Sequence, residues 1–323
     1  MTTSAHMAAM DRLIDRIERL HSAPHVVCQV LRLLQNEDYQ IHELVSCLQA
    51  DPALASSILR LVNSSYFGLA RHVGSVQQAV TFLGSRSLRL AVLSFGLLKQ
   101  LAKDAPALVY QDFWRRSLTM ASVASRLAAR QPRTGSGEAY SAGLLADVGL
   151  LVLAQVDTKG YVKLYERIGH SPLLIESERE RYGFHHGQLG ARLLHRWNLP
   201  LALTEAVSEH HARPATGSPL VVITHIADLL ADALWTPESP RVNEARALVE
   251  SQFQLDLDGF ITLAVECKKS IQENAETFQV TLANEIDCDA LLAQARRQYM
   301  DAAMEAAMDW DSLTAVANGE VAE

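Results

Sequence analysis

The spacing of apolar residues limits this chain to helical folds. In the segment SVQQAVTFLG (75–84), an apolar stripe with spacings of three and four residues is formed by Val76, Ala79, Val80 and Leu83. Ser75 stands three residues before Gln78, which is the spacing of a capping box at a helix N-terminus, and Gly84 follows as a helix stop. This segment is therefore predicted to be one capped helix.

The same periodicity recurs along the chain, in segments 26–35, 41–65, 118–130, 187–200 and 201–211. No segment shows the clear alternation of apolar and polar residues that marks a half-buried strand. Hydrophobic residues make up 49% of the chain, so it has enough apolar material to bury a core and does not belong to the disordered class. The predicted fold class is all-α.

Charge, cysteine usage and hydropathy exclude several classes of protein. The formal net charge of −8 argues against extensive binding to a nucleic-acid backbone, which requires a positive surface. The four cysteines include no CxxC pair, so neither a structural zinc site nor a disulfide framework is indicated. The best candidate for a membrane span, residues 219–235, is interrupted by His225, Asp228 and Asp232, and no signal peptide is apparent. We expect a cytoplasmic protein that does not bind membranes.

Acidic and imidazole side chains stand inside the apolar helical segments. The first interrupts the run YSAGLLADVGLLVL (140–153), and their order along the chain is Asp147, His186, His210, His211 and Asp228. Carboxylate and imidazole groups held by several helices are suited to binding a pair of metal ions. The alternative is a set of buried histidines that make structural hydrogen bonds, and the spacing alone leaves both interpretations open.

The order of the motifs resembles a known family. The most specific part is segment 44–93, in which Asp51-Pro52 opens a helix and Tyr66-Phe67-Gly68 turns the chain. The motifs that follow in the family's order are FWRRSL, AGLLADVGLLVL, ERERYGFHHGQLGARLLHRWNLP, AVSEHH and HIADLLA. Over residues 15–270 the chain resembles the HDOD (HD-related output domain) family of bacterial signalling proteins. That family is a degenerate branch of the HD and HD-GYP superfamily of metal-dependent phosphohydrolases.

The resemblance also identifies residues that this chain lacks. Metal-active HD enzymes have a histidine at the position of Ala146, where it forms a His-Asp pair with the position of Asp147, and the family frequently has another histidine at the position of Arg116. Two imidazoles are therefore missing, and one is exchanged for a permanent cation that repels metal ions. We expect no bound metal and no cofactor. The vestigial-site candidates are then Asp147, His186, His210, His211 and Asp228.

A buried carboxylate needs a partner, because an uncompensated charge in the protein interior is costly. We hypothesise that Arg116 lies near Asp147, and near Asp228 as well, as an internal counter-charge in place of the lost metal. The alternative is that Arg116 faces solvent.

The resemblance implies a domain organisation. An N-terminal helical bundle (15–105) is expected to pack on an HD-like helical core (106–235), with closing helices in 236–270. The C-terminal extension (271–323) lies beyond the resemblance. Its apolar stripe predicts a further helix that either packs back on the body or mediates a homodimer, followed by a frayed tail at 314–323.

The resemblance implies a function as well. We expect a non-catalytic signal-transduction module that acts by binding a signalling protein, whose identity the sequence does not give. Two alternatives stay open. One is a metal-dependent phosphohydrolase or cyclic-dinucleotide phosphodiesterase with a reduced ligand set, and the other is a sensor that binds a nucleotide without hydrolysing it.

Overall fold

The structure is a computed structural model that describes residues 3–20, 25–34, 40–63, 72–98, 101–102, 105–131, 134–197, 199–212, 217–278 and 280–317. All regular secondary structure in these residues is helical, which confirms the all-α prediction. The chain forms two compact units. The first comprises Met1–Asp228 and Cys267–Asn284, and the second comprises Leu229–Glu266 and Glu285–Glu323.

The N-terminal part of the first unit is a group of helices of different lengths. They are α1 (Thr3–Leu20), α2 (His25–Leu33), α3 (Ile41–Gln49), α4 (Pro52–Asn63), α5 (Val76–Leu93) and a π-helical turn, η1 (Ser94–Leu98). Helices α3, α4 and α5 pack against one another. Their shared interior consists of fully or almost fully buried apolar residues that include Leu44, Leu48, Ile58, Val62, Ala79 and Leu88. Helices α5 and η1 also contact α8 (Ser136–Leu145) in the rest of the unit, whereas α1 packs on α9 (Val148–Val156) and α12 (His186–Arg196).

The predicted cap of α5 is present. The backbone N–H of Gln78 donates to Ser75 Oγ at 3.2 Å, and the Gln78 side chain accepts from the backbone N–H of Gly74 at 3.0 Å. Gly84 has a φ of 67°, so the predicted stop is a kink, after which helix α5 continues to Leu93. The turn expected at Tyr66-Phe67-Gly68 lies outside the described residues.

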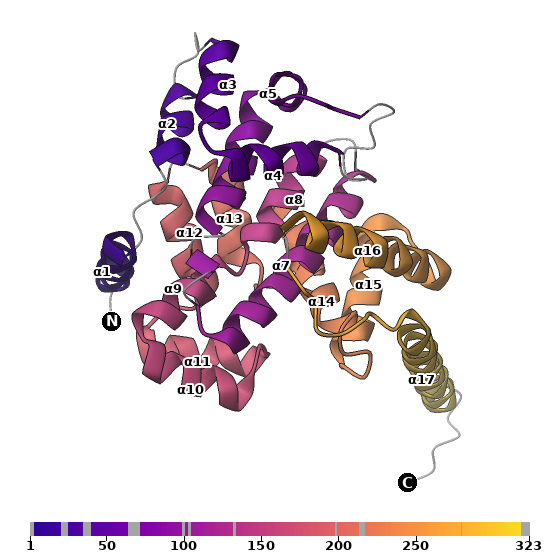
Figure 1. The fold of residues 1–323 in the computed structure, drawn as a ribbon. Coiled ribbons are helices and arrows are strands. Elements are labelled where there is room, and N and C mark those ends of the chain that lie inside the picture. Colours follow the sequence, from indigo (N-terminus) through magenta and orange to yellow (C-terminus); the bar gives the residue numbers. More distant parts are fainter. Residues whose placement is uncertain are drawn as a thin grey trace. The chain divides into compact units, whose positions relative to one another are not determined.

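The larger part of the first unit surrounds the long helix α7 (Ala107–Ala128), as Figure 1 shows. The helices that follow are α8 (Ser136–Leu145), α9 (Val148–Val156), α10 (Thr158–Ile168), α11 (Pro172–Tyr182), α12 (His186–Arg196), α13 (Leu201–Glu209) and α14 (Pro219–Ala233). The first ten residues of α14 belong to this unit. The most extensive packing is between α7 and α8, followed by α12 with α13 and α12 with α9.

Two glycines set the close approach of these helices. A Cβ atom on Gly143 of α8 would overlap the backbone of Met120 in α7, and one on Gly149 of α9 would overlap the carbonyl oxygen of His186 in α12. Only glycine allows backbones to approach so closely. Since Asp147 lies between Gly143 and Gly149, both contacts bring neighbouring helices to this one residue.

Among the residues that the structure describes, one helical stretch is long and apolar enough to cross a membrane, by length and composition alone. This stretch, Ser136–Val156, covers α8 and α9 and is 94% buried inside the protein, as is typical of core helices. The expectation that residues 219–235 are the best candidate was therefore wrong. Asp147 does interrupt the more apolar stretch, but a single carboxylate hardly lowers the average hydropathy of so apolar a sequence.

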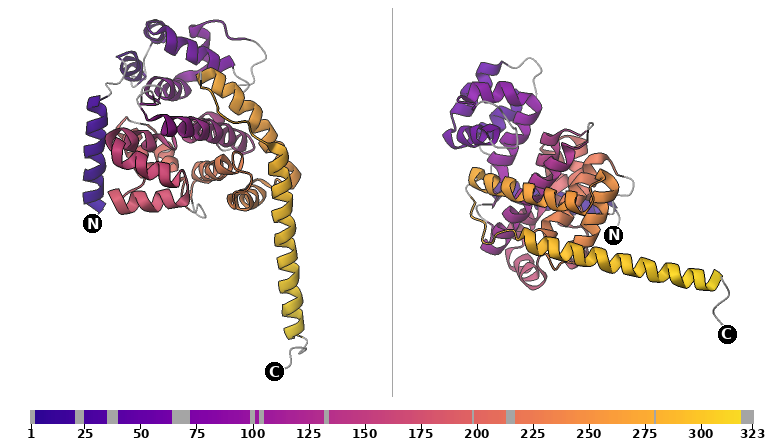
Figure 2. Two further views of the ribbon diagram at one scale, coloured as in Figure 1. Left: turned by 60° about the horizontal axis from the view of Figure 1, so that its bottom comes forward. Right: turned by 90° about the vertical axis from the view of Figure 1, so that its right-hand side faces the viewer.

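The second unit contains the end of α14, helix α15 (Arg241–Phe253), the start of α16 (Leu257–Phe278) and helix α17 (Cys288–Ala317). Figure 2 shows α17 as a long unbroken helix, which confirms the predicted C-terminal helix. It packs on α15, where the guanidinium carbon of Arg246 lies 5.0 Å from the centre of the Tyr299 ring. Helix α16 runs across the expected boundary at residue 270. The domain boundaries and a homodimer through α17 stay predictions, and the tail beyond Ala317 lies outside the described residues.

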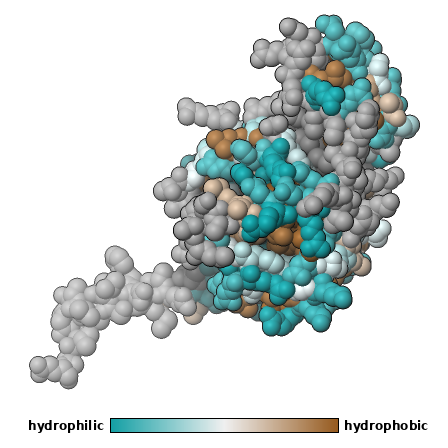
Figure 3. All heavy atoms as spheres, turned by 90° about the vertical axis from the view of Figure 1, so that its left-hand side faces the viewer, coloured by the Kyte–Doolittle hydropathy of each residue, from teal (hydrophilic) through white to brown (hydrophobic). Residues whose placement is uncertain are grey.

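The residues coloured by hydropathy in Figure 3 are mostly hydrophilic on this face, with hydrophobic residues in small separate patches. Scattered patches of this kind are normal for a folded protein and do not mark an interface. Among the coloured residues of this face, therefore, polarity does not single out a binding site, whereas the interior contains a cluster of buried polar groups.

Candidate functional site

Asp147 lies at the junction of α8 and α9, where its backbone (φ −92°, ψ 12°) leaves the helical conformation. Its side chain does not cap α9 and is fully buried. The junction instead directs the carboxylate towards other buried polar groups. The reason for an acid in this apolar segment is therefore to be found in the side chains around it.

Arg116 on α7 joins two of the candidate acids. Its Nε donates to Asp147 Oδ2 at 2.9 Å, and its Nη2 donates to Asp228 Oδ1 on α14. The Arg116 side chain is only 1% exposed, and both carboxylates are fully buried. The structure confirms the hypothesis that Arg116 is the internal counter-charge of these two acids. The close crossing of α7 and α8 explains the contact, since Arg116 lies one turn before Met120.

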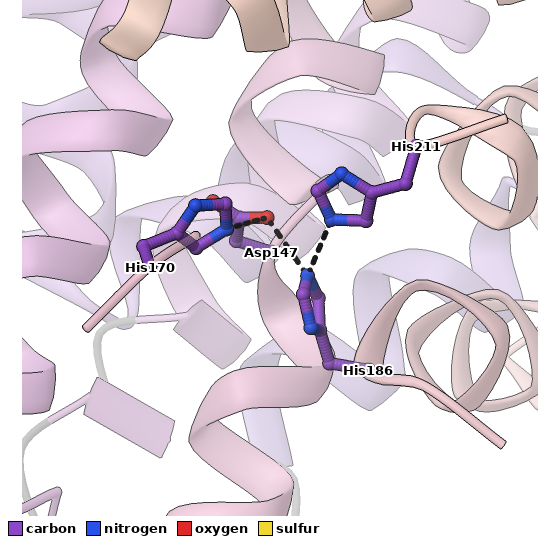
Figure 4. Close-up of side chains that lie close together, drawn as sticks. All are labelled: Asp147, His170, His186 and His211. Carbon is purple, nitrogen blue, oxygen red and sulfur yellow. Dashed lines mark hydrogen bonds and ion pairs between the residues drawn. The ribbon is translucent and has the colours of Figure 1, made fainter. Parts of the chain in front are cut away.

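Three imidazoles lie near the other oxygen of Asp147, and a fourth, that of His211, contacts one of them. Oδ1 lies 3.2 Å from His210 Nε2, 3.4 Å from His186 Nε2 and 3.9 Å from His170 Nε2. The Nε2 atoms of His186 and His211 are 2.8 Å apart. Figure 4 shows Asp147, His170, His186 and His211 pointing towards one another from separate segments of the chain. The sequence-predicted residues therefore do meet at one site.

Glu178 on α11 holds His186 in position from behind. Its Oε2 accepts a hydrogen bond from the His186 backbone N–H at 2.7 Å and lies 2.9 Å from His186 Nδ1. Tyr161 on α10 donates its hydroxyl to Oε1 of the same carboxylate. These contacts fix the His186 ring with Nε2 towards Asp147. A carboxylate behind a histidine in this way is a typical second-layer partner of metal-binding imidazoles.

The sequence analysis missed both Glu178 and His170. Glu178 begins the motif ERERYGFHHGQLG but was not singled out there, because acids are common on exposed helix faces. His170 follows Gly169, whose φ of 59° ends α10 and turns the chain before α11 starts at Pro172. A lone histidine between a glycine and Ser-Pro gives no periodic signal, so only the fold shows that its ring reaches Asp147.

Electrostatic effects lower the pKa of Asp147 and raise the pKa of His186. Burial alone would raise the pKa of Asp147, but the charge of Arg116 and the imidazoles of His186 and His210 hold it well below its usual range. Burial alone would lower the pKa of His186, but the carboxylates of Glu178 and Asp147 outweigh it and raise this pKa to about 9. In the absence of a metal, His186 is therefore a cation at neutral pH.

The neighbouring histidines are neutral. Burial lowers the pKa of His170 well below the usual value, and the charge of Arg116 lowers it further. Burial lowers the pKa of His211 in the same way, and His210 adds to that effect. Nδ1 of His211 lies 3.3 Å from Asp228 Oδ2 and donates its proton there, because a carboxylate only accepts. The Nε2 lone pair of His211 then faces His186.

His210 and His225 form hydrogen bonds to backbone carbonyl groups. His210 donates from Nδ1 to the carbonyl of Val207 at 2.6 Å, so that its Nε2 faces Asp147. His225 donates from Nδ1 to the carbonyl of His210 at 2.8 Å and so supports that residue. Ala146 is fully buried and offers no side-chain donor.

The donor atoms form two overlapping sets. One consists of Asp147, His170, His186 and His211, and the other of His210, His211 and Asp228, with the atoms of each set within 4.8 Å of one another. The second set shares His211 with the first, and its Asp228 already binds Arg116. Among the described residues, these two sets therefore share a ligand and do not form two independent metal sites.

The four-donor set does fit a single ion. In the described part of the chain, Asp147 Oδ1, which belongs to this set, makes no well-directed hydrogen bond although imidazole nitrogens lie around it. Buried polar atoms without hydrogen bonds are rare and call for an explanation such as an ion. The expectation that no metal binds stays a prediction, and it was made without His170.

The sequence of this chain matches a known protein family. The family model described as HDOD domain matches residues 20–213. An uncharacterized protein of Treponema pallidum is 27% identical over 206 residues, which are 62% of this chain and 39% of that protein. The chain thus spans about two fifths of that relative's length.

Solved structures share the fold. A protein of Shewanella amazonensis whose name suggests a phosphohydrolase has a TM-score of 0.64 at 23% identity, covering 84% of this chain and 97% of that one. An HDOD domain protein with unknown function from Geobacter sulfurreducens has a TM-score of 0.60 at 20% identity, with 83% and 99% covered. A protein of Marinobacter aquaeolei whose name suggests signal transduction has a TM-score of 0.59 at 26% identity, with 85% and 66% covered. Since the family model matches more than half of the residues, the chain belongs to the HDOD domain family.

Proposed function

We propose that this chain is a regulatory module of signal transduction that binds a partner protein and does not hydrolyse phosphodiesters. The observation that carries the proposal is the position of Arg116. Its guanidinium joins Asp147 and Asp228, the two acids that correspond to metal ligands in the superfamily. A bound guanidinium supplies charge but cannot supply a nucleophile.

Hydrolysis at HD sites depends on metal ions that generate hydroxide and offset the charge that develops in the transition state. Arg116 occupies the oxygens that would bind the second ion, and Ala146 contributes no ligand. Access is also restricted, because the side chains of Asp147 and His186 are fully buried and those of His170 and His211 are 4% and 7% exposed. A phosphodiester cannot reach these groups unless the helices move apart.

The relatives support a signalling role without excluding the alternative. The name of the Marinobacter protein suggests signal transduction, and that of the Shewanella protein suggests a phosphohydrolase. The second name and the cluster of imidazoles keep a metal-dependent phosphohydrolase as the competing function.

A turnover assay tests the proposal. Purified protein, loaded in turn with Mn²⁺, Fe²⁺ and Zn²⁺, is incubated with cyclic dinucleotides and with bis(p-nitrophenyl) phosphate. We expect no hydrolysis above that of the Asp147→Ala variant. Metal-dependent turnover that this variant loses would overturn the proposal. Capture experiments with the folded chain as bait, against a heat-unfolded control, are expected to enrich a signalling protein.

A further inference from the structure

The charges buried at the site do not balance. Three carboxylates, those of Asp147, Asp228 and Glu178, are fully buried, whereas Arg116 is the one guanidinium that contacts them among the described residues. Glu178 accepts hydrogen bonds from a hydroxyl, a backbone N–H and an imidazole, as an ionised carboxylate does. With His186 neutral, as a metal-ligating imidazole is, an excess of two negative charges remains in the interior, where uncompensated charge is costly. A protonated His186 offsets only one of the two.

The same site gathers four donors that fit a cation. Asp147 Oδ1 is oriented by the bond that Arg116 makes to the other oxygen, and Glu178 orients His186 from behind. Asp228 orients His211 in the same way. Such second-layer contacts are what hold metal ligands in place in proteins that bind metals.

His170 is the one donor of this set that the sequence analysis did not predict. It lies in none of the motifs by which the chain resembles its family, and its ring adds an imidazole where Ala146 and Arg116 have removed two. The ring centres of His170 lie 5.7 Å from His186 and 5.6 Å from His211. The loop before α11 therefore supplies a donor that the helices of the superfamily core do not.

We propose that Asp147, His170, His186 and His211 bind one divalent transition-metal ion, which serves regulation and not hydrolysis. This inference rests on the proposed function and specifies the ligand of its site. One divalent cation neutralises the excess of two negative charges. A second ion has no place, because Arg116 occupies Asp228 and the second oxygen of Asp147.

The chemistry of the donors selects the ion. Three imidazoles and one carboxylate suit Zn²⁺, Fe²⁺ or Ni²⁺, whereas Mg²⁺ prefers six oxygen ligands. The ion would link the start of α9, the loop before α11, the start of α12 and the end of α13. Its loss would loosen four segments at once, so occupancy would change the stability of the surface that these segments form.

The experiment measures metal content and thermal stability together. The full chain is stripped with EDTA, incubated with Zn²⁺ or Mg²⁺, dialysed and analysed for metal. We expect one Zn²⁺ per chain and no retained Mg²⁺. At a free Zn²⁺ concentration about 100 times the Kd, the thermal midpoint is expected to rise by roughly 5–10 °C.

Variants identify the ligands. His170→Ala is expected to weaken Zn²⁺ binding by about 100-fold or more, since even second-layer losses cost 10–100-fold. His195→Ala is the matched control, because this histidine is exposed on α12 and makes no contact with the site. Asp147→Asn, which keeps the side-chain shape, is expected to lose Zn²⁺ as His170→Ala does. Unchanged Zn²⁺ binding in a folded His170→Ala or Asp147→Asn variant would overturn the inference.

The failure of this inference is distinct from failure of the proposed function. A folded wild-type protein that retains no stoichiometric Zn²⁺ would overturn the metal site alone. A protein that binds one Zn²⁺ and hydrolyses phosphodiesters would keep the metal site and overturn the regulatory function. One bound Zn²⁺ without turnover supports both.

Discussion

Replacing Arg116 by alanine is expected to destabilise the fold strongly. Asp147 and Asp228 would lose their shared counter-ion while both remain fully buried. Breaking a buried ion pair by removing one partner costs roughly 3–5 kcal/mol, because the other charge is left uncompensated. For a folded unit of this size, about 2–4 °C of thermal midpoint corresponds to each kcal/mol, so the midpoint should fall by roughly 6–20 °C.

The measurement is thermal and urea denaturation of metal-free protein at neutral pH. Arg115→Ala is a matched control on the same helix, because Arg115 pairs with Asp112 at 2.9 Å but its side chain is 32% exposed. Exposed pairs contribute only about 0–1 kcal/mol. Adding Asp147→Asn to Arg116→Ala should recover part of the loss, since one stranded charge is removed. If Arg116→Ala costs no more than Arg115→Ala, the counter-charge account is wrong.

Three further predictions concern the titration of His186, the packing at Gly149 and the hydrogen bonds of Glu178. The pKa of His186 rises from 6.5 to about 9 on folding, so its stabilising contribution is complete below pH 6.5 and is lost as pH rises through 9. The unfolding free energy of metal-free protein should fall by ~3 kcal/mol over that range, and His186→Gln should lack this fall. Gly149→Ala should lower the thermal midpoint strongly because its Cβ would overlap the His186 carbonyl, whereas Gly74→Ala, which has open space around it, should not. Glu178→Gln should lower the unfolding free energy by about 2–3 kcal/mol at pH 6, where His186 is charged, and by less at pH 9. Urea denaturation at both pH values measures the difference.

Local patterns were sufficient to predict much of the fold. The segment around Ser75 and Gln78 carries its own capping signal, and the Gln78 N–H does bond to Ser75 Oγ. The Gln78 side chain accepts from Gly74, one residue earlier than in a capping box. Gly84 was a less certain guide, because a positive φ can kink a helix without ending it. Helix formation depends on near neighbours in the sequence, and for that reason it can be read from the sequence directly.

The site was predictable only in part. Arg116 could be matched to Asp147 because a carboxylate in an apolar segment requires a partner and a cation stood where the family has a ligand. His170 and Glu178 join the site through the packing of α10, α11 and α12, which no local pattern encodes. Their contribution depends on contacts between segments and had to be found in the structure.

The number of divalent ions bound per chain tests the central claim most directly, namely that Arg116 stands in the place of a lost ion. Zn²⁺ content after dialysis is compared between wild type and the double variant Ala146→His with Arg116→His. Restoring both imidazoles removes the cation and completes the superfamily ligand set around Asp147, so we expect one ion in wild type and two in the double variant. Two ions in wild type, or no gain in a folded double variant, would contradict the account.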